Sequence, residues 1–276
     1  MSELITAGRK RVPRALDSRS FPGVGPVAIA ALVFLYLPML VTTIYAFNSG
    51  DQALVWEGFS THWFGYVLTN HTMIDTAVTS VQLAAAATLT AVVMALAFAL
   101  AVDGLRRRGS ALANALMAAP LVIPEVVLAV ATLAFIRMIG LQPGFLSLYL
   151  AHTTFCIPFA LMPIRSRLDG IGREVFEAGA DLGATAVPML WRITLPLLVP
   201  GLVSGALLSF VISMDDFIIS SFLSSAGSTT LPVYLYGLIR RGPTPAINVV
   251  ALLLLALAVV VTSFTYLAPK KKRSES

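Results

Sequence analysis

Three carboxylates stand inside long apolar stretches of this sequence: Glu125, Asp215 and Asp216. A charged side chain near the middle of a membrane-spanning helix costs about 2.5–3.5 kcal/mol, so such residues usually face a pathway, a partner or water. Counted at about 1.5 Å per helical residue, Glu125 and Asp215 reach a similar depth in the membrane. Buried carboxylates at one level can replace the hydration of an ammonium ion. The three residues are therefore predicted to line the path of a cationic solute.

A second interpretation of the same carboxylates is structural. The two aspartates could bond to neighbouring helix ends or to Arg240 and Arg241, and Glu125 could simply follow the helix-distorting Pro124. Adjacent residues on a helix point about 100° apart, which gives the two aspartates different directions. The sequence leaves both interpretations open.

The other reactive residues predict no metal, nucleotide or catalytic site. His62, His71 and His152 are far apart in the sequence and lack the cysteine or carboxylate neighbours of a zinc site. His152 is expected to hydrogen bond between helices, and Cys156 to pack in apolar surroundings. Because the sequence contains no GxxxxGK[ST] motif, ATP is expected on a partner rather than on this chain. No constellation of an intramembrane enzyme is present, which favours a transport protein with no cofactor of its own.

The elements that must position these carboxylates are predicted to be membrane helices. Of 276 residues, 57% are hydrophobic and 12% are charged, whereas soluble domains are about 25% charged. About 20 apolar residues of helix are needed to cross a bilayer. Six segments qualify, and the fourth is the weakest because Pro158 and Pro163 should kink it. Their ranges are 24–47, 77–102, 111–139, 145–164, 197–222 and 246–268.

The predicted fold is an all-α membrane protein with one six-helix domain at 24–268, between tails 1–23 and 269–276. Sixteen of the nineteen lysines and arginines lie in the two tails and in the 2–3 and 4–5 loops. Basic residues prefer the cytoplasmic side, so both termini are expected in the cytoplasm of a bacterial inner membrane. The basic leader precedes a block too long for a signal peptide, and the first helix is expected to remain as an anchor. Because membrane topology explains the net charge of +5, no nucleic-acid partner is expected.

The predicted cytoplasmic loop at 165–196 is patterned rather than disordered. Arg173 to Leu182 predicts a short helix stopped by Gly183. Thr185 can cap a second short helix that ends before Pro196. Two short helices with a glycine between them would form a compact protrusion on the cytoplasmic face.

A motif within this loop resembles the EAA motif of permease subunits in binding-protein-dependent ABC importers. It consists of Glu177-Ala178-Gly179, three residues, Gly183, nine residues, and then Ile193-Thr194-Leu195-Pro196. The family pattern has alanine where this chain has Gly179. In that family the segment docks on the ATPase subunit, which would assign coupling to Glu177, Ala178, Gly179, Asp181, Gly183, Ile193, Leu195 and Pro196.

The resemblance extends over nearly the whole chain to spermidine/putrescine permeases of the PotC and PotI type. The stretches that carry it are Ser213-Met214-Asp215-Asp216-Phe217, Thr230-Leu231-Pro232 and Pro245-Ala246-Ile247-Asn248. It implies the MetI-like fold of type I importers and transport of putrescine or spermidine. The implied partners are a second permease, expected to be a homologue, two ATPases that bind ATP and magnesium, and an extracytoplasmic solute-binding protein.

Two alternatives remain at this point. Importers of opines, aminobutyrate, phosphonates and ferric iron share parts of these stretches, so the same architecture could carry another solute. A stand-alone secondary transporter or channel would be expected to contain an inverted repeat, which the sequence does not display. The sequence therefore predicts an importer subunit.

Overall fold

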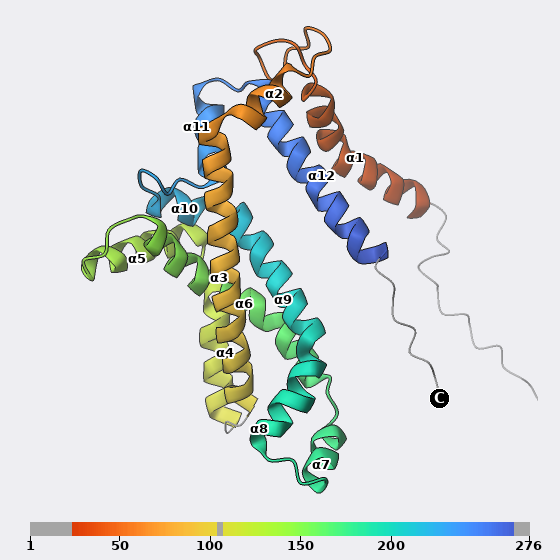
Figure 1. The fold of residues 1–276 in the computed structure, drawn as a ribbon, viewed down its shortest axis with the longest axis vertical. Helices are drawn as coiled ribbons and strands as arrows, with labels where there is room; N and C mark the ends of the chain where they lie inside the picture. The colour runs from red at the N-terminus through yellow and green to blue at the C-terminus, as the bar shows by residue number, and fades with distance from the viewer. Residues whose placement is uncertain (1–23, 104–106, 268–276) are drawn as a thin grey trace, which may run out of the picture. The chain divides into compact units, whose positions relative to one another are not determined.

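The computed structural model describes residues 24–103 and 107–267, so the predicted tails 1–23 and 269–276 lie outside the described residues, as do positions 104–106 of the predicted 2–3 loop. The described chain is helical and contains no strand, which confirms the all-α prediction (Figure 1). The elements are α1 (Val24–Tyr45), α2 (His62–Thr69), α3 (His71–Asp103), α4 (Arg107–Val122), α5 (Glu125–Met138), α6 (Phe145–Asp169), α7 (Arg173–Asp181), α8 (Ala186–Pro188), a π-helical segment (Met189–Thr194), α9 (Leu195–Asp215), α10 (Ile218–Leu223), α11 (Leu231–Arg241) and α12 (Pro245–Leu267).

The chain divides into two compact units, of which the first holds the residues up to Phe64 and those from Thr244 onward. Within it α1 packs on α12. The connection after α1 is ordered by Asn48, a buried amide that accepts from the backbone N–H groups of Gly50 and Glu57. Its Nδ2 donates to the carbonyl of Val55 at 2.6 Å. A fully bonded side chain therefore fixes this loop without a regular element.

The second unit, residues 65–243, contains a core of three helices, α3, α6 and α9, which pack on one another. Alanines spaced four apart along α3, including Ala91, Ala95 and Ala99, are buried and let α6 approach closely. Gly205 of α9 has the same purpose, because a Cβ there would lie 2.7 Å from the carbonyl oxygen of Ala160. Small side chains, rather than large apolar ones, set the distance between these helices.

Four helical runs among the described residues are long and apolar enough to cross a membrane: α1, α3, α6 and the continuous stretch Ala186–Asp215. A bent pair, Ala111–Val122 and Glu125–Met138, makes a fifth span if it is counted as one. The apolar part of α12 that can be described, Pro245–Val260, is shorter. The multi-span prediction is confirmed, whereas the count of six is not reached within these residues.

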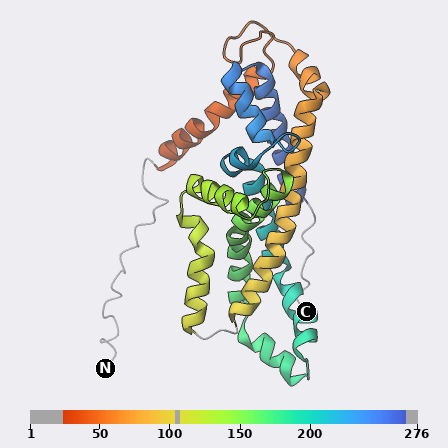
Figure 2. The ribbon, with the colours of Figure 1, turned by 90° about the vertical axis from the view of Figure 1, so that its left-hand side faces the viewer.

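Two predicted spans are broken, contrary to expectation. The span predicted at 111–139 bends by 106° between α4 and α5 (Figure 2). Pro124 lies at this bend and caps α5; proline has no N–H to continue the helical ladder and its ring clashes with the preceding turn. The span predicted at 197–222 ends at Asp215, because Asp216 is extended, and resumes at Ile218 as α10.

The fourth span is the least apolar of the four described runs, which agrees with its prediction as the weakest, but its two prolines do not end the helix. Helix α6 continues through Pro158 and Pro163 to Asp169, and 56% of its most apolar window is buried, the largest share among the spans. Burial between α3 and α9 supports the backbone where the prolines remove hydrogen bonds.

The protrusion expected at 165–196 was predicted correctly in its first half and wrongly in its second. Helix α7 spans Arg173–Asp181, and Gly183 follows with a φ of +77°, a left-handed conformation that favours glycine. The second helix does not end before Pro196. It runs through the π-helical segment into α9, where Pro196 occupies the first turn and needs no N–H partner.

Candidate coupling segment and solute path

The residues of the EAA-like motif lie on α7, in the turn after it, on the π-helical segment that packs against α7, and in the first turn of α9. Glu177, Ala178, Asp181 and Gly183 are exposed, whereas Gly179 is buried. A Cβ at Gly179 would lie 2.8 Å from Cε of Met189 and 2.9 Å from Cδ1 of Ile193, which is the contact between the two parts of the protrusion. The motif thus has an inner face that joins the two helices and an outer face that is free.

The outer face of the protrusion also carries large apolar side chains. Leu182 is 89% exposed, Val187 67% and Trp191 66%. Exposed apolar groups next to exposed carboxylates are typical of a surface that another protein covers. Of the remaining predicted coupling residues, Ile193 and Leu195 are half-buried and Pro196 is exposed.

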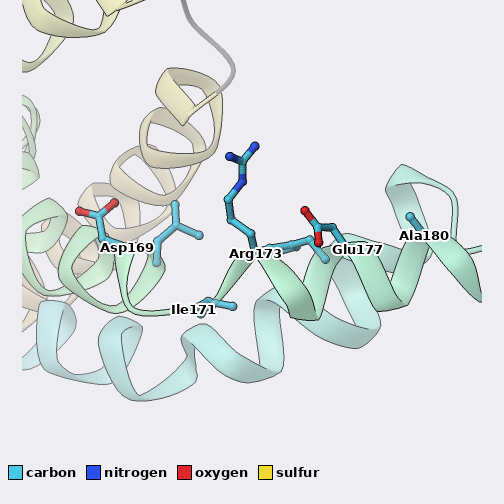
Figure 3. A pocket seen from close by; sticks show the side chains of 7 residues that line it. Asp169, Ile171, Arg173, Glu177 and Ala180 are labelled. Carbon is cyan, nitrogen blue, oxygen red and sulfur yellow. The ribbon is translucent and has the colours of Figure 1, made fainter.

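An open pocket of about 680 Å³ lies beside the motif. Figure 3 shows Arg173 and Glu177 on the same side of α7, with Asp169 at the end of α6 on the other side of the turn. Its apolar lining comes from Leu168, Ile171, Phe176 and the Ala180 methyl group. The pocket therefore combines both signs of charge with an apolar floor.

Two arginines near the end of α6, just before the protrusion, form hydrogen bonds with neighbouring helices. Arg167 of α6 donates through Nε to the carbonyl of Leu197 in α9, at 2.9 Å. Arg165 bonds to the amide oxygen of Asn114 in α4 and lies 3.9 Å from Asp169. The sequence predicted only the side of the membrane for these arginines, because the distribution of basic residues does not indicate their hydrogen-bond partners.

The membrane carboxylates are placed at the two helix breaks. Glu125 is the first residue of α5, and Asp216 lies between α9 and α10. Helices α5 and α10 pack on each other, and the carboxyl of Glu125 lies against that of Asp216 and interacts with it. Asp215 instead is exposed and forms no hydrogen bond or ion pair with the described part of the chain. The structure thus pairs Glu125 with Asp216 rather than with Asp215.

Asp216 is held through one of its two oxygens. The backbone N–H of Ser220 donates to Oδ1 at 2.8 Å, and Nε2 of His152 lies 3.6 Å from the same oxygen. The other oxygen, Oδ2, is buried and has no hydrogen-bond partner among the described residues. A buried acceptor without a partner carries a large desolvation penalty, so this oxygen favours the approach of a hydrogen-bond donor.

His152 connects both sides of the break that follows α9. Its Nδ1 lies 2.8 Å from Oγ of Ser213, and its Nε2 lies 3.1 Å from Oγ of Ser220. The prediction of an interhelical hydrogen-bonding histidine is confirmed. The two serines were not predicted, because residues about 60 positions away give no sign of the contact. We call these five residues, Glu125, His152, Ser213, Asp216 and Ser220, the carboxylate junction.

The arginines offered above as partners of the aspartates have other contacts. Arg240 lies over the ring of Tyr236, with its guanidinium carbon 5.9 Å from the ring centre. Arg241 donates to the carbonyl of Gly237 at 3.1 Å. Tyr236 in turn packs on Phe217, the residue after Asp216, with 4.6 Å between the ring centres. An aromatic and cationic group therefore borders the carboxylates.

Solved structures with the same fold are importers. The chain is similar to a subunit of a bacterial ABC transporter involved in the import of the polysaccharide alginate, with a TM-score of 0.68, 16% identity and coverage of 92% of this chain and 99% of the other. It also resembles a subunit of the MetNI methionine ABC transporter, with a TM-score of 0.57, 20% identity and coverage of 71% and 95%. These likenesses confirm the predicted MetI-like permease fold.

Sequence relatives are closer. The chain is 38% identical to the spermidine/putrescine transport system permease protein PotC of Haemophilus influenzae, covering 86% of this chain and 93% of that protein. It is 39% identical to the putrescine transport system permease protein PotI of Escherichia coli K12, covering 83% and 84%. Residues 91–273 match the family model described as the inner membrane component of binding-protein-dependent transport systems. The chain therefore belongs to this family of importer permeases, a multi-pass inner-membrane transport subunit rather than an enzyme.

Proposed function

We propose that this chain is a permease subunit of an ATP-driven importer that carries putrescine or spermidine across the bacterial inner membrane. The observation that carries the proposal is the meeting of Glu125 and Asp216 at two helix breaks. Two carboxylates at one place match a solute with two or more ammonium groups. The names of the relatives in the PotC and PotI group support the same solute.

The breaks are suited to a polar cargo. Non-helical backbone at membrane depth is tolerated where it is buried in protein or lines a water-filled cavity. Transporters commonly place solute sites at such discontinuous helices. An ammonium group that passes the junction would donate to the unpartnered Oδ2 of Asp216, and Glu125 would add charge from the facing helix. We retain exposed Asp215 as a flanking carboxylate of the path.

The protrusion is proposed to receive the ATPase. Its exposed residues Glu177, Ala178, Asp181 and Gly183 would enter the partner, while Gly179 keeps α7 seated on the π-helical segment. That segment is part of one continuous helical run, Ala186–Asp215, about 45 Å long at 1.5 Å per residue. Movement at the docking surface would thus reach the residue before Asp216 without an intervening joint.

The proposed assembly follows the partner types of such importers. It contains a second permease, a homologue of this chain, two ATP-binding subunits that hold ATP and magnesium, and an extracytoplasmic solute-binding protein. Both termini are proposed to lie in the cytoplasm, with the membrane domain at 24–268, the coupling loop at 165–196 and tails at 1–23 and 269–276.

The test uses the reconstituted complex with binding protein loaded with putrescine, spermidine or a neutral solute. We expect ATP hydrolysis and uptake to be stimulated by the amine-loaded protein and uptake to fall in Asp216→Asn. Stimulation only by another solute would discard the polyamine assignment and keep the importer. Uptake by this chain without an ATPase would overturn the importer itself.

A further inference from the structure

We infer that His152 is a positioning residue for the solute path: it clamps the break between α9 and α10 and so fixes the orientation of the Asp216 carboxylate. The inference rests on the proposed function, in which Asp216 meets the solute. His152 itself is placed behind the path, where it is 1% exposed.

The imidazole bonds to both ends of the break. Ser213 lies in the last turn of α9, and Ser220 lies in α10, so the ring spans the interruption between the two helices. Neutral imidazole donates from one nitrogen and accepts at the other, and each serine hydroxyl can supply the complementary role. Helix α6, which carries the ring, is the central helix of the core. The His152 side chain therefore holds the break in a fixed position relative to α6.

The ring acts on Asp216 through Ser220. At 3.6 Å, the separation of Nε2 from Oδ1 is too long for a direct hydrogen bond. Ser220, however, bonds to His152 through its hydroxyl and donates its backbone N–H to Oδ1 of Asp216. Holding Ser220 holds Oδ1, which leaves Oδ2 as the oxygen without a partner. Of the two carboxylate oxygens, Oδ1 thus has a structural hydrogen bond, and Oδ2 is available to a cation.

Packing alone does not require this arrangement. Cys156 lies one turn further along α6, is completely buried, and forms its hydrogen bonds with the backbone carbonyl and hydroxyl of Ser209 in α9. An apolar side chain of similar size at position 152 would fill the same space but could not bond to either serine. Position 156 thus offers a matched control on the same helix face, with hydrogen bonds to α9 alone and none across the break.

The experiment is a double-mutant cycle in the reconstituted complex. The variants are His152→Leu, His152→Gln, Asp216→Asn, the double variant of His152→Leu with Asp216→Asn, and the control Cys156→Ala. The uptake rate of putrescine and spermidine is measured at saturating loaded binding protein and normalised to the amount of assembled complex. Loss of a hydrogen-bonded support for a buried charge predicts at least about a tenfold fall in uptake for His152→Leu.

Three further results are expected. Glutamine, which keeps a donor and an acceptor, restores part of the rate, and Cys156→Ala stays within about twofold of wild type. In the Asp216→Asn background, His152→Leu causes no additional loss, because it acts through that carboxylate. Independent, additive losses, or unchanged uptake in His152→Leu, would overturn the inference.

Failure of the proposed solute gives a different result. If the wild-type complex transports neither amine, the polyamine assignment falls. The same variants are then compared by the thermal stability of the purified complex. Stability losses of His152→Leu and Asp216→Asn that are not additive support the positioning role, and additive losses overturn it.

Discussion

The coupling segment and the carboxylate junction use charged residues in opposite ways. On the protrusion, Glu177 and Asp181 are exposed and lie four residues apart on one helix, beside exposed apolar side chains such as Leu182. At the junction, Asp216 is buried, and the other four residues of the junction come from four different helices. The first region leaves its charged groups exposed, as the proposed docking on an ATPase requires, whereas the second supports its polar groups from within the chain. Charge alone therefore does not reveal function; its surroundings do.

The continuous helical run from Ala186 to Asp215 links the two regions. Its beginning packs under α7 through Ile193, and its end supplies Ser213 to His152. Changes in the coupling segment should therefore affect energy transfer and leave the fold intact. Changes at the junction or in the core should affect the solute or the packing of helices.

The largest effect is expected from Glu177→Lys, which reverses a charge on the free face of α7. We expect normal membrane insertion and loss of ATP-driven uptake, because the ATPase would meet the wrong charge. Uptake and co-purification of the ATPase are measured together. Glu174→Lys, the same change one turn earlier and outside the motif, serves as the control. Normal uptake in Glu177→Lys would contradict the proposed docking role of the exposed charges on the protrusion.

A smaller loss is expected from Asp216→Asn than from uncoupling. The variant keeps the shape of the side chain and removes its charge, so uptake of a cation should fall by about tenfold or more. Asp215→Asn is the matched neutralisation at an exposed position, and its effect should be smaller. Uptake at saturating binding protein decides the order. A larger loss of uptake in Asp215→Asn would mean that the exposed Asp215, rather than Asp216, is the main carboxylate of the solute path.

The core contact is tested by Gly205→Ala. The added Cβ would meet the backbone of Ala160 at 2.7 Å, which cannot move easily, and the free energy of unfolding should fall by about 1–3 kcal/mol. Gly237→Ala places the same methyl group in α11, where nothing lies within 4 Å. That control should be neutral or more stable by up to about 1 kcal/mol. Thermal unfolding of the purified complex measures both, and equal midpoints would contradict the close packing of α6 and α9.

The smallest effect is expected from Gly179→Ala. Here the added Cβ would meet the ends of the flexible Met189 and Ile193 side chains rather than backbone. These ends can shift, so the cost should be below about 1 kcal/mol, and solute-stimulated ATP hydrolysis should remain close to wild type. A severe loss of stimulation would mean that the inner face of the protrusion is as specific as its outer face.

Much of the fold follows from local information. Apolar length predicted membrane helices, and Gly183 predicted the end of α7 within one residue. The prolines were harder to interpret. Pro124 marks a sharp bend, while Pro158 and Pro163 lie within a continuous helix. Proline removes the same hydrogen bond in each case, and only the neighbouring helices decide whether the backbone stays straight.

The sequence by itself determined the membrane class, the permease family and the position of the EAA-like motif, because hydropathy and motif spacing are properties of contiguous residues. Tertiary structure decided which carboxylate faces which. Asp215 and Asp216 are indistinguishable by type and depth, and the extended backbone at Asp216 turns it toward His152 and Glu125. Such pairing depends on where two helices break and on how the following segments pack. Those are long-range outcomes that no local pattern encodes.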